Sequence, residues 1–343
     1  MAEKVLELED LAVSFDTPQG EVEAVRGVDL CVEQGEILCV VGESGCGKTV
    51  MCRSVMHLLP PIARIRRGRI TVCGQDITYA TEKQMRTVRG SVMSMIFQDP
   101  LETLNPTIPV GKQIMEVICR HRKVSGEEAK ARTLELLDMV GIENAAERFF
   151  LQPHFLSGGM RQRCVIAAAL AADPKLLFAD EATTALDVTV KSKILDLFLA
   201  IREKTGAATV FVTHDLGSVA RIADRVAVMY AGKVVEIGTA EEIFYDPRHP
   251  YTWGLLSSLP ALALESGKLS YIPGMPPDLL DPPPGDAFAA RNPYALAIDY
   301  AQMPPMFRVS GTHYAATWLL DERAPKITPP IALRERSRKW IQR

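Results

Sequence analysis

The stretch GESGCGKT, Gly42–Thr49, restricts the possible folds of this chain more than any other feature. It fits the pattern G-x-x-x-x-G-K-[ST] and directly follows the apolar run EILCVV, which is typical of a strand. Glycines let backbone N–H groups turn inward around phosphates, Lys48 reaches the outer phosphates, and the Thr49 hydroxyl binds magnesium. The alternative is an ordinary glycine turn, but a strand before it and a helical pattern after it favour a phosphate-binding loop.

Four more apolar runs alternate with helical patterns as far as about residue 250. They read SVMSMIFQ, KLLFAD, TVFVTHD and VAVMYAG. Apolar strands separated by helices are typical of a parallel sheet buried on both faces, so we predict an α/β fold with a mostly parallel sheet. Three segments alternate polar and apolar residues and predict a side antiparallel sheet. These are VLELEDLAVSF, EVEAVRGVDLCVEQG and GRITVCGQDI.

A helical subdomain is predicted inside the core, at about residues 99–158. Its clearest helix follows Ser125 and Glu128, which stand at capping-box spacing, and it ends at Gly141. Small or apolar residues recur along that helix at the spacing of one buried face. We therefore expect an inserted helical lobe within a larger domain that covers residues 1–258.

The character of the chain changes after that domain. Six prolines stand between Pro273 and Pro284, which favours extended loop over continued core. We predict a boundary near residues 255–260 and a loop-rich C-terminal module at 259–343.

Composition excludes several classes of protein. The net charge of −3 gives no basic bias, so no nucleic-acid partner is expected. The N-terminus lacks the pattern of a secretory signal, and the longest apolar run, CVIAAALAA, is too short to span a bilayer. Seven cysteines without C-x-x-C spacing suggest reduced thiols in the cytosol, most of them acting as small core residues.

Polar residues end the predicted parallel strands and so should meet at one edge of the sheet. Asp180 is the expected magnesium carboxylate, and Glu181 is free to orient a water for attack on a γ-phosphate. His214 and Gln98 end two other strands and point to the same edge. Two acids after a strand are more often a solvated turn, and a single histidine is more often structural. Because a phosphate loop is predicted at the same edge of the sheet, we favour a functional role for the two acids and for His214.

A second glycine pair, in FLSGGMRQRC, precedes another helical run. Backbone N–H groups at a helix start bind anions, yet the chain already has a phosphate loop about a hundred residues earlier. A simple helix cap would explain the glycines but not their position in the helical insert.

These motifs together resemble the ATP-binding subunits of ATP-binding cassette (ABC) importers, in the subfamily for oligopeptides, dipeptides and nickel. The similarity covers nearly the whole length and rests on GESGCGKT, IFQDPLETLNP, LSGGMRQR, LLFADEATTALDVT, FVTHD and DPRHPYTWGLLSSLP. It implies an ATPase with an ABC-type phosphate-loop core and an oligopeptide-transporter-type C-terminal module.

The resemblance also implies roles for individual residues. ATP would be held by Gly42, Glu43, Ser44, Gly45, Cys46, Gly47, Lys48 and Thr49, and magnesium by Thr49, Gln98 and Asp180. Phe15 would stack on adenine, Gln98 would contact magnesium and the attacking water, and His214 would touch the γ-phosphate. Lys48 and Glu181 complete the catalytic set.

The second glycine pair is explained by the same resemblance. Two cassettes close head to tail, so Ser157, Gly158 and Gly159 would cap ATP held by the other cassette, with Asp187 at the seam. The partners implied are a second, non-identical ATPase subunit, two membrane permease subunits and, indirectly, an external solute-binding protein. The chain would lie on the cytoplasmic face of the cell membrane. The segment after Gln98 and the helical insert would form the coupling surface.

Peptide is the expected solute, while nickel or another small solute remains an alternative. A soluble ABC protein of DNA repair or translation would need a zinc module, coiled-coil arms or a tandem cassette. A non-catalytic nucleotide sensor would lack Glu181.

The sequence departs from the family pattern in two places. Ala182 replaces the usual proline after the two acids, with little consequence expected. The four cysteines that hold an iron–sulfur cluster in many members are replaced by Asp286, Asn292, Asp299 and Thr317. We therefore predict no such cluster, since hard oxygen donors replace all four thiolates. Asp286 and Asp299 could instead hold a hard cation, but two carboxylates on a loop are more often solvated. We expect the module to keep its fold through residues such as Pro293, Tyr294 and Trp318.

Overall fold

The computed structural model describes residues 3–184, 186–259 and 271–330. Its strands are β1 (Lys4–Thr17), β2 (Gly20–Glu33), β3 (Ile37–Val41), β4 (Ala63–Val72), β5 (Gln75–Asp76), β6 (Met93–Ile96), β7 (Leu176–Asp180), β8 (Ala208–Thr213), β9 (Arg225–Tyr230), β10 (Lys233–Thr239), β11 (Phe307–Arg308) and β12 (Tyr314–Ala315). Its helices are α1 (Lys48–Val55), α2 (Glu82–Val88), α3 (Pro100–Thr103), α4 (Val110–His121), α5 (Gly126–Met139), α6 (Ala145–Arg148), α7 (Gly158–Leu170), α8 (Val188–Thr205), α9 (Leu216–Ile222), α10 (Ala240–Tyr245) and α11 (Pro250–Ser257). Within the described ranges, no helix is long and apolar enough to span a bilayer.

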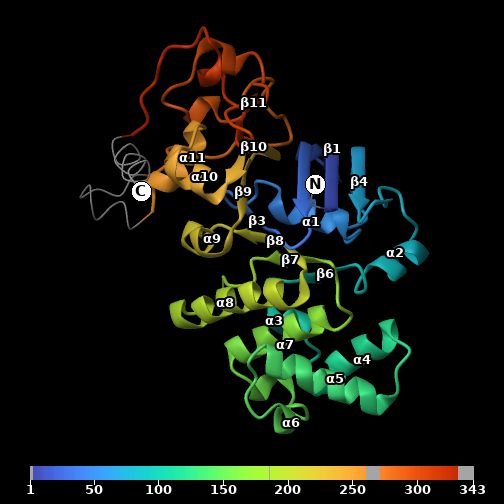
Figure 1. Cartoon of the computed structure of the whole chain (residues 1–343). Helices are drawn as coiled ribbons and strands as arrows, with labels where there is room; N and C mark the ends of the chain where they lie inside the picture. The colour runs from blue at the N-terminus through green and yellow to red at the C-terminus, as the bar shows by residue number, and fades with distance from the viewer. Residues whose placement is uncertain (1–2, 185, 260–270, 331–343) are drawn as a thin grey trace.

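The main sheet lies at the centre of the molecule (Figure 1). Its strand order is β11-β12-β10-β9-β3-β8-β7-β6, and the five strands from β9 to β6 run parallel. Every residue of β3, β7 and β8 is buried, as expected for strands covered on both faces. The predicted parallel sheet of apolar runs is confirmed.

The two faces of the main sheet pack against different elements. Leu38 and Val40 of β3 face a cluster that includes α1 and the side sheet, whereas Cys39 faces a cluster that includes α7, α8 and α9. Successive side chains of a strand point to opposite faces, so α1 and α7 lie on opposite sides of the sheet. Figure 1 shows α1 above and α7 below the central strands.

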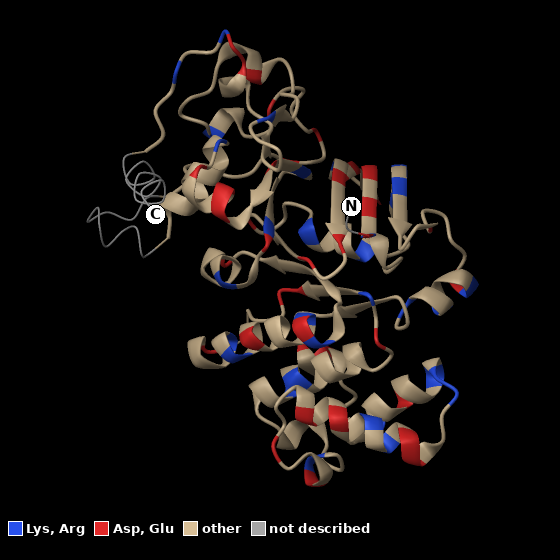
Figure 2. Ribbon diagram, in the orientation of Figure 1, with Lys and Arg blue, Asp and Glu red and all other residues tan. Residues whose placement is uncertain are grey.

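The side sheet is antiparallel, in the order β2-β1-β4-β5, as its alternating pattern predicted. Ion pairs link β4 of this sheet to β1 and β2. Arg66 contacts Asp16 at 2.5 Å and Glu21 at 2.7 Å, and Arg67 contacts Asp10 at 2.7 Å. Figure 2 shows basic and acidic residues side by side on these strands.

The helical part contains α3 to α6 and the start of α7 (Figure 1). Helix α5 begins with the predicted capping box, in which Ser125 and Glu128 bind each other's backbone N–H, and buries Leu136 and Leu137. Helix α7 begins at the expected subdomain boundary but packs both on α4 and α5 and on β6. It therefore connects the helical part to the main sheet.

The C-terminal part adds strands to the main sheet. Strand β12 pairs with β10 through Glu236 opposite Ala315 and Ile237 opposite Tyr314, and β11 extends the edge. The expected boundary near 255–260 overlaps the end of α11 at Ser257, and its last residue, Pro260, lies outside the described residues. The expectation of a loop-rich module omitted this shared sheet, because two-residue strands give no periodic pattern in sequence.

Glu236 anchors the junction between β10 and the C-terminal part. It is fully buried and accepts hydrogen bonds from the backbone N–H groups of Arg248 at 2.6 Å and His249 at 3.0 Å. Its Oε1 also lies 2.7 Å from Nε2 of His313. One carboxylate thus joins β10 to the segment before α11 and to the C-terminal part.

We predict that Glu236→Gln lowers the free energy of unfolding by about 2 kcal/mol, because an amide NH2 then faces buried N–H donors. Urea unfolding of the full chain measures the change. Glu241→Gln, on an exposed position of α10, is the matched control and should stay within about 0.5 kcal/mol of the parent chain. Equal stabilities of the two variants would contradict this role of Glu236.

Candidate functional site

The loop between β3 and α1 has a backbone that only glycine fits at key points. Gly42 and Gly47 have φ values of 154° and 100°. A Cβ atom would lie 2.2 Å from the carbonyl oxygen of Met229 at Gly42, and 2.3 Å from that of Ala24 at Gly47. At Gly45, with φ of 81°, a Cβ would meet nothing within 4 Å, so this turn faces open space.

Lys48 is folded back over this loop. Its Nζ donates to the carbonyl oxygens of Gly42 at 2.8 Å and Glu43 at 2.9 Å, and its side chain is buried. Among the described residues, the N–H groups of Ser44 and Gly45 have no hydrogen-bond partner. Free N–H donors beside an ammonium group at a helix start suit a polyphosphate.

Thr49 and Asp180 lie together at the carboxyl ends of the parallel strands. The Thr49 hydroxyl donates to Oδ1 of Asp180 at 2.8 Å. Burial raises the pKa of the Asp180 carboxyl, and the hydrogen bond from Thr49 opposes that shift. A buried carboxylate beside a hydroxyl supplies the oxygen ligands that magnesium prefers, so these residues fit a Mg²⁺ ion.

Glu181 follows directly and adopts a left-handed backbone, with φ of 50°. Its N–H donates to the carbonyl oxygen of Val212 at 3.0 Å, which ties the turn to β8. Its Oε1 lies 3.3 Å from Nδ1 of His214, and its Oε2 accepts from the Thr184 hydroxyl at 3.1 Å. The structure therefore brings Glu181 and His214 together at the strand ends, as their spacing after β7 and β8 predicted.

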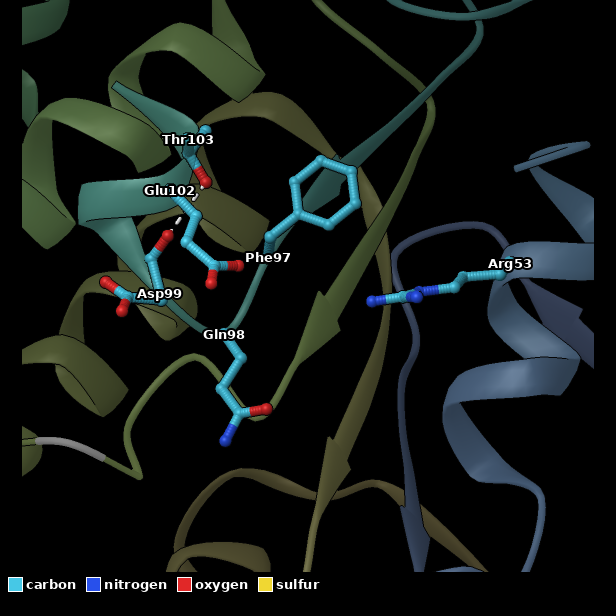
Figure 3. A pocket seen from close by; sticks show the side chains of 6 residues that line it. All are labelled: Arg53, Phe97, Gln98, Asp99, Glu102 and Thr103. Atoms are coloured by element: carbon cyan, nitrogen blue, oxygen red, sulfur yellow. Dashed lines mark hydrogen bonds between the residues drawn. The ribbon is translucent and has the colours of Figure 1, made fainter. Parts of the chain in front are cut away.

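Gln98 follows β6 and lines an open hollow of about 660 Å³. Figure 3 shows Arg53 reaching from α1 towards the segment that carries Phe97 and Gln98. Asp99 and Glu102 lie on the other side of the Gln98 backbone. The hollow joins the strand edge to α3, so one segment extends from the site to the outer surface.

The second glycine pair opens α7. The Ser157 hydroxyl caps this helix by accepting from the N–H of Met160 at 3.4 Å, and a Cβ at Gly158 would meet nothing within 4 Å. A Cβ at Gly159 would lie 2.6 Å from Cγ1 of Val190, in the first turn of α8. Asp187 caps α8 by accepting from the N–H of Val190 at 2.9 Å. The two helix starts therefore adjoin each other, while α1 lies on the opposite face of the main sheet.

The four residues at the family's cysteine positions are all buried. Each uses a side-chain oxygen to accept from a nearby backbone N–H: Asp286 from Phe288 at 3.0 Å, Asn292 from Tyr294 at 3.0 Å, Asp299 from Leu296 at 2.6 Å, and Thr317 from Leu319 at 3.3 Å. The expectation that Asp286 and Asp299 are solvated is therefore wrong, because they cap turns inside the module. Pro293 is exposed, whereas Tyr294 packs edge-on against Trp253 at 5.4 Å.

Phe15 lies half-buried on β1, opposite Val22 of β2 and Ala63 at the start of β4. Its role remains a prediction. The sequence reasoning missed Arg53 in the hollow. It also missed Arg291, which contacts Glu43 of the phosphate loop at 2.6 Å from 248 residues away. No local pattern marks such a distant pair.

The comparisons with known proteins agree with this geometry. A family model described as ABC transporter matches residues 25–184, and one described as oligopeptide/dipeptide transporter, C-terminal region, matches residues 235–298. The chain is 56% identical to the oligopeptide transport ATP-binding protein OppD of Bacillus subtilis, over 98% of this chain and 94% of the relative. It belongs to the oligopeptide/dipeptide family of ABC transporter ATP-binding proteins. The dipeptide transport protein DppD of Lactococcus lactis is 51% identical, over 98% of this chain and 97% of the relative.

Solved structures confirm the cassette fold. Two dimeric structures of the bacterial ABC transporter cassette MJ0796, one of them bound to ADP and Pi, match with a TM-score of 0.62 and 26% identity. Each match covers 68% of this chain and 98% of MJ0796. The predicted family, the fold class and the ABC transporter ATPase activity of the chain are thereby confirmed.

Proposed function

We propose that this ATPase energises the uptake of peptides through separate membrane subunits, by ATP-driven closure of a cassette dimer. The observation that carries the proposal is the 2.8 Å contact between Thr49 and Asp180, beside Lys48 and Glu181. This contact supports a magnesium site beside the phosphate loop, next to the residue that would orient water. Binding, metal and hydrolysis functions thus share one edge of the sheet.

Nucleotide binding would use the open loop above Gly45. The Lys48 ammonium exchanges two loop carbonyls for the outer phosphates of ATP, while the free N–H groups of Ser44 and Gly45 donate to phosphate oxygens. Thr49, Asp180 and Gln98 would hold magnesium, which neutralises phosphate charge when bound. Phe15 covers the adenine face.

Hydrolysis would depend on Glu181. Its carboxylate orients the attacking water, and His214, 3.3 Å away, fixes that carboxylate and contacts the γ-phosphate. The turn at Glu181 is tied to β8 through Val212, so its side chain is held at the strand edge. Gln98 completes the set from the end of β6.

Closure requires a second cassette, because α1 and α7 occupy opposite faces of the sheet. The helix start at Ser157, Gly158 and Gly159 would cap ATP held by the other cassette's loop, with Asp187 at the seam. The dimeric cassettes among the matched structures support this arrangement. The partner is a second, non-identical ATPase subunit.

Closure of the cassette dimer would be transmitted to two permease subunits at the hollow beside Gln98. Its segment Asp99–Thr103 leads outward from the site and contacts α7 through α3. The chain would lie on the cytoplasmic face of the membrane and act indirectly with an external solute-binding protein. Peptide is the proposed solute, because the named relatives are oligopeptide and dipeptide transport proteins. No nucleic acid is involved.

We predict that Lys48→Ala lowers kcat for ATP at least about 100-fold, because the cation for the outer phosphates is lost. Glu181→Gln should lower kcat by a similar factor but keep ATP binding and prolong the closed dimer. ATPase assays and gel filtration with ATP, magnesium and the partner cassette measure both effects.

Lys204→Ala and Glu203→Gln, two exposed positions near the end of α8, are the matched controls and should hydrolyse ATP normally. Normal turnover by the Glu181 variant would refute the catalytic assignment. Native mass spectrometry of the membrane complex identifies the solute, and bound nickel instead of peptide would refute the peptide proposal.

We also predict that the chain binds no iron–sulfur cluster. The residues at the cysteine positions do not fit one, because their oxygens cap backbone N–H groups and offer no thiolate. In addition, the described ranges contain no group of three His, Cys, Asp or Glu residues that could hold a metal ion.

Anaerobically purified protein should be colourless, with no absorbance band near about 400 nm and no stoichiometric iron. A known iron–sulfur protein carried through the same procedure is the control for cluster loss. A brown sample with about four irons per chain would contradict the prediction.

A further inference from the structure

An arginine of the C-terminal part reaches the phosphate loop. Nη1 of Arg291 donates to Oε2 of Glu43 at 2.6 Å, and Nη2 donates to Oε1 at 2.9 Å, which makes a two-point contact. The Arg291 side chain is only 5% exposed and the Glu43 side chain 28%. Paired geometry and burial set this contact apart from a surface ion pair.

The guanidinium is fixed by the module that carries it. Nε of Arg291 donates to the carbonyl oxygen of Pro273 at 2.8 Å, and Nη1 donates to the Tyr230 hydroxyl at 3.1 Å. Arg291 directly precedes Asn292, whose side chain caps a turn of the module. The position of the charge therefore depends on the order of the C-terminal loops.

Glu43 is held at its backbone as well as at its side chain. Its N–H donates to the Tyr251 hydroxyl at 2.8 Å, and its carbonyl oxygen accepts from Lys48 at 2.9 Å. Tyr251 packs against Tyr230 at 4.6 Å and against Phe288 at 5.3 Å. This aromatic cluster and Arg291 together brace the first half of the phosphate loop.

We propose that Arg291 is a positioning residue for ATP binding: it braces the phosphate loop and neutralises Glu43, so that nucleotide affinity depends on an ordered C-terminal module. An acid inside a loop that binds polyphosphate is unfavourable unless its charge is balanced. Arg291 supplies that balance without touching the nucleotide. When Lys48 turns to the phosphates, the brace keeps Glu43 in place. The inference rests on the proposed function, in which Gly42–Thr49 is the nucleotide loop.

The test compares the binding of Mg-AMP-PNP to the full chain by calorimetry. Arg291→Gln is expected to raise Kd at least about threefold, as is typical for coupled groups in contact. The Arg291→Gln/Glu43→Gln double variant should bind no worse than Glu43→Gln alone, because the unbalanced acid is gone. Arg291→Lys should fall between parent and Arg291→Gln, since lysine keeps the charge but not the two-point contact.

Arg323→Gln is the matched control, because it removes the same charge from an 84% exposed position of the same module. It should bind as the parent chain does. In the assembled transporter, Arg291→Gln should raise KM for ATP by more than it lowers kcat, which a purely structural role would not produce. If Arg291→Gln does not fold, the Kd values of Arg291→Lys and Glu43→Gln test the inference instead. Parental Kd values in both of these variants would then overturn it.

Parental Kd in folded Arg291→Gln, an equal loss in Arg323→Gln, or independent effects in the double variant would each overturn the inference. Lys48→Ala separates this failure from failure of the proposed function. Loss of binding in Lys48→Ala with parental binding in Arg291→Gln refutes only the brace. Parental binding in Lys48→Ala refutes the nucleotide loop and the brace together.

Discussion

The complete burial of β3, β7 and β8 is the constraint on which the rest of the molecule depends. Strands covered on both faces have no room for charged side chains along their length, so polar residues emerge where the strands end. Asp180 and His214 take those places, Thr49 reaches Asp180 from the helix after β3, and His214 contacts Glu181. The candidate site residues gather at one edge because the buried interior of the sheet excludes polar side chains.

The same sheet separates the phosphate loop from the second glycine pair. One face carries α1 and the side sheet, and the other carries α7 with the start of α8. A single chain therefore presents a phosphate loop and a capping helix to different sides. This separation is a physical argument for the proposed pairing of two cassettes, in which the open backbone at Gly158 would face the second cassette.

The sequence predicted those features that depend on the residues of one short segment. The glycines of the phosphate loop, the apolar run before Asp180 and the capping box at Ser125 are local patterns, and the structure has each in the expected element. Burial of Asp286 could not be predicted, because an acid on a loop gives the same pattern whether it is solvated or caps a buried turn. The Arg291–Glu43 pair was missed since only the folded chain brings its partners together.

The pairing of β12 with β10 protects an edge of the main sheet. Without the C-terminal residues, β10 would present unpaired backbone groups along Glu236 and Ile237, and an open strand edge is a template for aggregation. The short added strands close that edge, and β11 then forms the new border with only two residues. A lineage that lost this tail would have to cover the edge anew before the shortened cassette could persist in a crowded cell.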